Sequence, residues 1–146
     1  LTIKLVEELR ENESGVYGVG ARGSMNKVPY GSYNFSISFP CGPENAEKLT
    51  ESALRELNKM VTNGPEQKDL DKFKESSRLE YKESLKDNRY WMSVLKRQYT
   101  DGVNPEEVFE FEAKLNALTV KELQDVAKKY LAKDKVIGML MPEESK

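Results

Sequence analysis

The feature that most constrains the fold is a regular alternation of apolar and polar side chains over residues 33–39. The polar positions are one asparagine and two serines, and the apolar positions are Tyr33, Phe35, Ile37 and Phe39. Because successive side chains of a strand point to opposite faces, the alternation predicts a β-strand with one buried face. We expect it to pair antiparallel with a glycine-rich strand around residues 16–24, across a turn at 26–31, and to pack its apolar face under helices.

Apolar residues at helical spacing dominate the rest of the chain. We predict one helix from Leu1 to about Asn12, with Gly15 as its stop, and another from Pro43 to Asn63. Further helices are expected to begin at Pro65, near Asn88, at Asn104 and at Thr119.

Three local patterns add detail to these elements. Thr119 and Glu122 form the pattern of a capping box at the start of the last helix. The helix expected to begin near Asn88 carries an apolar stripe. An apolar run at 136–141, stopped by a proline, predicts a final strand. The residues of that stripe are Met92, Leu95 and Tyr99.

The order of elements is a helix, two strands, several helices and one strand. Strands segregated from helices predict an α+β fold in which helices cover one face of an antiparallel sheet. Three strands make a thin sheet for so large a helical layer, so we expect more strands upstream. We interpret residues 1–146 as a single domain, a fragment of a larger multidomain protein.

The composition excludes several classes of partner. Hydrophobic residues make up 38% of the chain and charged residues 33%, with a net charge of -2. This balance gives no electrostatic reason to expect nucleic acid or an anionic membrane surface as partner. The apolar runs are too short to predict a membrane span.

The chain is also poor in catalytic side chains, because it has no histidine and a single cysteine, Cys41. Histidine is the commonest metal ligand and the commonest general base. A zinc peptidase site needs three protein ligands, usually including histidine. We therefore expect no catalytic residue and no stoichiometric zinc on this chain, and we interpret Cys41 as a small buried thiol.

Two motifs in the glycine-rich segment resemble known sites but lack the required context. Residues 18–23 spell G-x-G-x-x-G, which binds a dinucleotide only between a preceding strand and a following helix. Here a predicted helix precedes it and a predicted strand follows. Ser24 and Lys27 spell S-x-x-K, without the S-D-N and K-T-G signatures that this chemistry needs.

Arg10 and Tyr17 are the candidate binding residues. The residues alone leave two interpretations open. Arg10 can be a cation that suits the C-terminal end of a helix dipole, and Tyr17 an ordinary strand residue. Alternatively, both side chains can contact a ligand.

The stretch from Leu9-Arg10-Glu11 to Gly15-Val16-Tyr17 resembles one in the pitrilysin/insulinase-type (inverzincin) zinc metallopeptidases, where it closes a helix and opens a strand. The likeness continues along nearly the whole chain, to the second portion of the family's C-terminal, non-zinc-binding peptidase domain. It includes the strand and Pro/Gly turn at 35–43, the helix restart after 63–65, and the closing helix and strand at 118–142. Asp69-Leu70 stands where the family commonly has E-L.

This resemblance implies a processing-peptidase-like half-domain, truncated at its N-terminus. Zinc would be held by H-x-x-E-H in a homologous partner half, and this motif has no counterpart here. The guanidinium of Arg10 would hold a substrate backbone carbonyl. The hydroxyl of Tyr17 would donate to the carbonyl oxygen as negative charge builds there.

The hypothesis that follows is a non-catalytic domain that binds peptide substrate and helps to form the chamber of a zinc-dependent endopeptidase. Its partners would be a zinc-bearing homologous domain or subunit and a peptide. One alternative is an inactive relative that serves as a scaffold or partner subunit with no role in proteolysis. Another is an unrelated α+β binding module. An upstream H-x-x-E-H would favour the first hypothesis, and a degraded one the scaffold.

Overall fold

The computed structural model describes residues 1–27, 29–102 and 104–143. The chain divides into two compact units. The first comprises Leu1–Pro65 and the chain from Gln124 onward, and the second comprises Glu66–Leu123.

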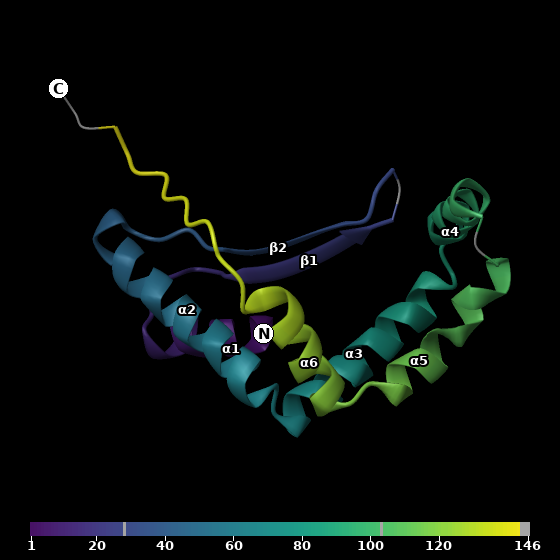
Figure 1. The fold of residues 1–146 in the computed structure, drawn as a ribbon, viewed down its shortest axis with the longest axis horizontal. Coiled ribbons are helices and arrows are strands. Elements are labelled where there is room, and N and C mark those ends of the chain that lie inside the picture. The colour runs from purple at the N-terminus through teal and green to yellow at the C-terminus, as the bar shows by residue number, and fades with distance from the viewer. Residues whose placement is uncertain (28, 103, 144–146) are drawn as a thin grey trace. The chain divides into compact units, whose positions relative to one another are not determined.

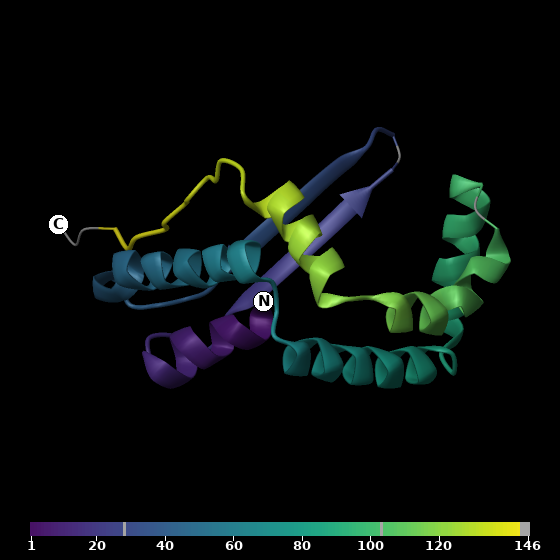
Figure 2. The ribbon, with the colours of Figure 1, turned by 60° about the horizontal axis from the view of Figure 1, so that its bottom comes forward.

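The first unit contains a two-stranded antiparallel sheet with helices on one of its faces (Figures 1 and 2). The strands pair in one continuous register, from Gly20 opposite Ser38 to Asn26 opposite Ser32. The fold class is therefore α+β, as the sequence predicts. The elements in chain order are α1 (Thr2–Leu5), the π-helix η1 (Val6–Asn12), β1 (Gly20–Asn26), β2 (Ser32–Ser38), the 3-10 helix η2 (Pro43–Asn45), α2 (Ala46–Asn63) and α6 (Val120–Leu131).

The parity predicted for residues 33–39 is confirmed. The polar side chains at 34, 36 and 38 are exposed, whereas Phe35, Ile37 and Phe39 are partly buried. Ile37 and Phe39 pack against the core that the helices form. Tyr33, at the far end of β2, is 45% exposed and meets the ring of Tyr130 edge to face.

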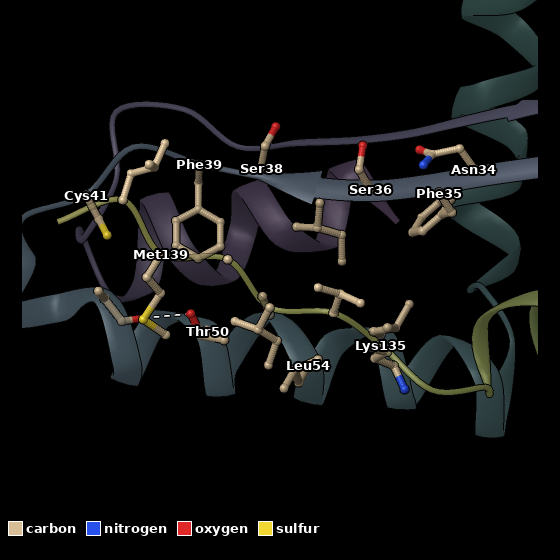
Figure 3. Close-up of a pocket in the computed structure, with 18 of the residues that line it drawn as sticks. Asn34, Phe35, Ser36, Ser38, Phe39, Cys41, Thr50, Leu54, Lys135 and Met139 are labelled. Atoms are coloured by element: carbon tan, nitrogen blue, oxygen red, sulfur yellow. Dashed lines mark hydrogen bonds between the residues drawn. The ribbon is translucent and has the colours of Figure 1, made fainter.

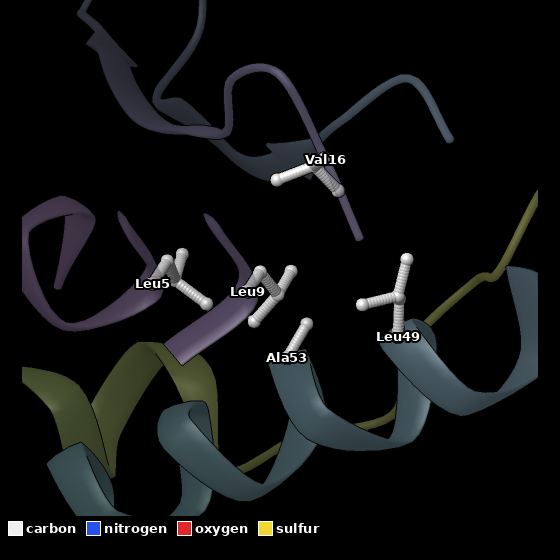
Figure 4. Packing of buried hydrophobic residues seen from close by; sticks show 5 residues of the cluster. All are labelled: Leu5, Leu9, Val16, Leu49 and Ala53. Carbon is white, nitrogen blue, oxygen red and sulfur yellow. The ribbon is translucent and has the colours of Figure 1, made fainter. Parts of the chain in front are cut away.

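The core of the first unit joins the N-terminal helix to α2 beneath the sheet (Figure 4). Leu5 and Leu9 are fully buried, and Leu49 is 1% exposed. Helical spacing places these leucines on the facing sides of their helices. The complete cluster of buried residues is Leu5, Leu9, Val16, Leu49 and Ala53.

Most predicted helix ends are confirmed. Gly64 and Gly102 follow α2 and α4 with φ of 74° and 66°, a conformation that glycine adopts without steric cost. Thr119 and Glu122 form the capping box, with reciprocal hydrogen bonds of 3.2 Å and 2.9 Å. The first helix ends at Asn12, as predicted, but beyond it Ser14 and not Gly15 adopts the left-handed conformation, with φ of 50°.

The second unit is helical, and aromatic contacts hold it together. The rings of Tyr81 and Phe111 stack at 4.4 Å, and the Tyr81 hydroxyl donates to the Val108 carbonyl at 3.0 Å. No helix among the residues that the structure describes is long and apolar enough to span a membrane. The elements of this unit are α3 (Gln67–Ser84), α4 (Asn88–Asp101), the 3-10 helix η3 (Pro105–Glu110) and α5 (Phe111–Ala117), and α6 begins at its end.

The apolar stripe predicted on α4 is not buried. Met92 is 69% exposed, Leu95 42% and Tyr99 86%. Helical spacing identified one face of the helix correctly, but spacing alone does not determine which surface covers that face.

The predicted final strand at 136–141 is also wrong. This segment is extended but belongs to no strand, and Val136 and Leu140 are fully exposed. An apolar run favours a strand only where another strand supplies hydrogen-bonding partners. Among the described residues, no strand lies beside this segment in a ladder.

Candidate functional site

Arg10 lies on an unusually wide helical turn. Residues Val6–Asn12 form a π-helix, a rare geometry that occurs often at functional sites. Beyond its end, the Gly15 amide donates to the Leu9 carbonyl at 3.0 Å. The Arg10 side chain is exposed and makes no hydrogen bond or ion pair with the residues that the structure describes. Its guanidinium is therefore available for an external acceptor.

Tyr17 lies where the pairing of the two strands is interrupted. Val16 pairs with Cys41, and the regular ladder resumes at Gly20 and Ser38. Three residues, 17–19, therefore face two residues, 39 and 40, which is the arrangement of a β-bulge. Pro40 has no backbone N–H to continue the ladder there. The strand around 16–24 that the sequence predicts consequently begins at Gly20.

The bulge leaves Tyr17 free to contact a ligand. Its side chain is 97% exposed, whereas the neighbouring Val16 is 7% exposed. The buried Val16 therefore fixes the backbone beside Tyr17, whereas the phenol ring of Tyr17 is exposed to solvent. Bulges commonly redirect a side chain in this way next to active sites.

The turn between Arg10 and Tyr17 packs closely against α2. A Cβ atom on Gly15 would lie 2.7 Å from one methyl carbon of Leu49 and 2.8 Å from the other. Because Leu49 is 1% exposed, its side chain has little room to move away. Glycine is therefore required at position 15 for close approach and not for a positive φ.

We predict that Gly15→Ala lowers the free energy of unfolding by about 1–3 kcal/mol, the usual cost of overpacking a tight site. In a Leu49→Ala background the same substitution should cost much less, because the clashing methyl groups are gone. Urea unfolding of the unsubstituted chain, the two single variants and the double variant measures the coupling energy between positions 15 and 49 in a double-mutant cycle. An equal cost of Gly15→Ala in both backgrounds would rule out the steric explanation.

Glu13 ties the same turn to α2 by polar contacts. Its carboxylate accepts a hydrogen bond from the hydroxyl of Ser52, which is fully buried. Lys48 Nζ lies 3.0 Å from Glu13 Oε2, and Arg55 Nη2 lies 3.5 Å from Oε1. The hydrogen bond from Ser52 lowers the pKa of Glu13 below its ordinary value of 4.5, and Lys48 and Arg55 lower it further, against the opposing effect of burial.

This lowered pKa predicts how stability depends on pH. A carboxyl whose pKa is lower in the folded state stabilises the fold above its unfolded pKa, and loses that contribution as pH falls through the folded pKa. We expect Glu13→Gln to lower the free energy of unfolding by about 1.5 kcal/mol at pH 7, and the gap to the unsubstituted chain to close below about pH 4.5. Urea unfolding from pH 7 to pH 3 measures this gap. A gap that does not change with pH would show that the charge of Glu13 is not what stabilises the turn.

A cavity of about 1140 Å³ lies elsewhere in the first unit, between the apolar face of β2, α2 and the segment 133–142 (Figure 3). Phe35 and Phe39 point toward α2, and Thr50 and Leu54 face them from that helix. The lining residues include neither Arg10 nor Tyr17. The wall is formed mainly by apolar side chains, so the cavity offers a packing surface rather than catalytic groups.

The residues present do not fit a zinc site. The chain has no histidine, and its one cysteine, Cys41, is partly buried and free. Within the described ranges, no three Cys, Asp or Glu side chains lie close enough to hold a metal ion.

Sequence reasoning named Arg10 and Tyr17 as candidates, a role that stays a prediction, and it gave no sign of the contact between Glu13 and Ser52. Glu13 is one of several glutamates near the end of a helix, and Ser52 lies 39 positions further along. No local pattern connects two residues at that separation.

Comparison with known proteins places these features in a family. The model of the family described as "Peptidase M16 inactive domain" matches residues 2–77, slightly more than half of the chain. The matched part includes the helix with Arg10, the hairpin with Tyr17, and α2. A curated relative, "Zinc protease PQQL-like" from Arabidopsis thaliana, is 30% identical over 70 residues, which are 48% of this chain and 7% of the relative.

Solved structures share the fold. The periplasmic protease PqqL from Escherichia coli has a TM-score of 0.71 at 22% identity, over 90% of this chain and 14% of that one. A peptidase M16 inactive domain from Pseudomonas fluorescens has a TM-score of 0.74 at 21% identity, over 86% and 29%. The inactive peptidase domain of a putative zinc protease from Bordetella parapertussis has a TM-score of 0.65 at 13% identity, over 99% and 84%. The chain thus spans less than a tenth of its curated relative and under a third of two of these structures.

Proposed function

This chain belongs to the family of peptidase M16 inactive domains, and we propose that it binds peptide substrate and helps to form the chamber of a zinc-dependent endopeptidase. It performs no hydrolysis itself. A zinc-bearing homologous domain or subunit faces it and carries the chemistry. Arg10 and Tyr17 are its contacts to the substrate.

The observation that carries this proposal is that two exposed donors, which have no hydrogen-bond partner among the described residues, flank a tightly held turn. The fork of the Arg10 guanidinium suits a backbone carbonyl of an extended peptide. The Tyr17 hydroxyl suits the same class of acceptor, and its hydrogen bond strengthens as negative charge develops on the carbonyl oxygen. Both groups keep the conformational freedom to meet a substrate, while the backbone between them is fixed.

The zinc of this proposal lies outside the chain. The description of one curated relative as a zinc protease supports its presence in a longer protein. Zinc would supply a polarised carbonyl and an activated water there. The role of this chain is to bind and orient the peptide.

The alternative is a scaffold or partner subunit that never touches substrate. The apolar stripe on α4 favours an assembly role of some kind, because Met92 and Tyr99 are largely exposed. Such a role is compatible with substrate binding, so the decisive measurement is contact with the peptide.

Photo-crosslinking tests that contact directly. In the longer zinc-bearing protein, Tyr17 is replaced by p-benzoylphenylalanine. The glutamate of the H-x-x-E-H motif is also replaced. A peptide substrate is then added before irradiation. We expect a crosslink between position 17 and the peptide. The same amino acid at Tyr99, which is 86% exposed on α4, is the matched control. Equal labelling at both positions, or none at position 17, would favour the scaffold.

A further inference from the structure

Glu13 lies between the two proposed substrate contacts, three residues after Arg10 and four before Tyr17. Its side chain is only 12% exposed. It is the point at which the end of η1 is tied to the middle of α2, because its carboxylate contacts Lys48, Ser52 and Arg55 of that helix.

These contacts form a chain of directional bonds. The buried hydroxyl of Ser52 donates to Glu13 and accepts from Arg55 Nη2 at 2.8 Å. Arg55 also lies 3.8 Å from Glu8 Oε1, one turn earlier on the π-helix. Lys48 and Arg55 are more than half exposed, so their ion pairs contribute little energy on their own. Ser52 is different, because it is fully buried and defines one direction of approach for Glu13.

The residue after Glu13 shows why such a restraint is needed. Ser14 has φ of 50°, a left-handed conformation that few residues other than glycine adopt. Conformations of this kind persist only where the surrounding structure holds them, and they cluster at functional sites. Glu13 ties the turn to α2 by polar contacts, and Gly15 lies close to Leu49 on the same helix.

We propose that Glu13, held by Ser52, is a positioning residue that sets the direction in which Arg10 and Tyr17 face the substrate. This inference rests on the proposed substrate-binding role. The two donors are exposed and form no hydrogen bond with the part of the chain that the structure describes, so their orientation depends on the backbone from which they project. A small displacement of such groups is enough to slow catalysis greatly.

The test compares Glu13→Ala, Glu13→Gln and Ser52→Ala in the longer zinc-bearing protein. We expect Glu13→Ala to lower kcat/KM by about tenfold to a hundredfold. Glu13→Gln should retain more activity than Glu13→Ala, because the amide oxygen still accepts from Ser52. Glu11→Gln is the matched control, since Glu11 is exposed near the same helix end and forms no hydrogen bond or ion pair with the described residues. It should leave kcat/KM unchanged.

A second control separates positioning from simple stability. Leu57 is 4% exposed on α2, and Leu57→Ala should destabilise the unit while leaving kcat of the folded protein unchanged. In the 146-residue chain, Glu13→Ala should also speed amide exchange at Gly15, whose N–H is bonded to the Leu9 carbonyl. Leu57→Ala should speed it much less.

The outcomes distinguish this inference from the proposed function. If Arg10→Ala and Tyr17→Phe slow cleavage but Glu13→Ala leaves kcat/KM within twofold, the positioning role is overturned and substrate binding stands. If Glu13→Ala and Leu57→Ala lose activity in proportion to their loss of stability, Glu13 is merely structural. If Arg10 and Tyr17 variants cleave at the unsubstituted rate, the proposed function fails, and the positioning role fails with it.

Discussion

In the longer zinc-bearing protein that we propose, replacing Tyr17 with phenylalanine is expected to slow peptide cleavage about a hundredfold. Loss of one donor to a developing oxyanion typically costs about 3 kcal/mol of transition-state stabilisation. The substitution removes only a hydroxyl from a side chain that is 97% exposed, so folding and zinc content should not change. The loss should therefore appear in kcat, because the hydrogen bond strengthens in the transition state.

Arg10→Ala is expected to slow cleavage to a similar extent but to raise KM more than Tyr17→Phe does. The guanidinium would bind a substrate carbonyl in both the ground state and the transition state. Steady-state kinetics on peptides, with circular dichroism and metal analysis of each variant, measure these effects.

Tyr99→Phe and Arg97→Ala are matched controls on α4. They remove the same groups from exposed positions outside the proposed site, and both should cleave at the unsubstituted rate. Unchanged turnover in Tyr17→Phe and Arg10→Ala would leave the simpler interpretation, in which Arg10 is a helix-end cation and Tyr17 a surface residue of a bulge.

Leu49→Ala is expected to destabilise the first unit by about 3 kcal/mol, within the range for removing a large aliphatic side chain from a core. Leu49 is 1% exposed and belongs to the same buried cluster as Leu9, Val16 and Ala53 (Figure 4). Removing its side chain leaves a space beside these neighbours, and the cost of that cavity adds to the lost burial. Since single domains are stable by only about 5–15 kcal/mol, the effect should be large in urea unfolding.

The matched control is Leu140→Ala, the same substitution at a side chain that is fully exposed. It should change the free energy of unfolding of the 146-residue chain by less than about 0.5 kcal/mol. A cost at Leu140 similar to that at Leu49 would mean that segment 136–141 is packed in solution, against the exposure described here.

Local patterns predicted much of the fold correctly. The alternation at 33–39 identified both the strand and its buried face, because period two leaves a half-buried strand few alternatives. Gly64 and Gly102 marked helix ends through their freedom to adopt positive φ. The two hydrogen bonds of the capping box between Thr119 and Glu122 formed as predicted, because the two residues are only three positions apart.

Longer-range features could not be predicted in this way. The apolar stripe on α4 correctly indicated a helix, but the apolar run at 136–141 forms no strand. Burial and strand pairing depend on neighbouring surfaces that local sequence does not encode. Ser14, rather than Gly15, adopts the left-handed conformation, and Gly15 instead lies close to Leu49, 34 positions away.

For the candidate site, too, local sequence and long-range contacts determined different features. By itself the sequence determined only which groups the chain offers: the guanidinium of Arg10 near a helix end, the phenol of Tyr17 shortly after it, and no histidine. Only the tertiary structure decided that Tyr17 lies in a bulge, and that Glu13 meets Ser52 across 39 residues. The physical reason is that caps, turns and periodicity depend on neighbours within about one helical turn, whereas burial and orientation depend on residues that only folding brings together.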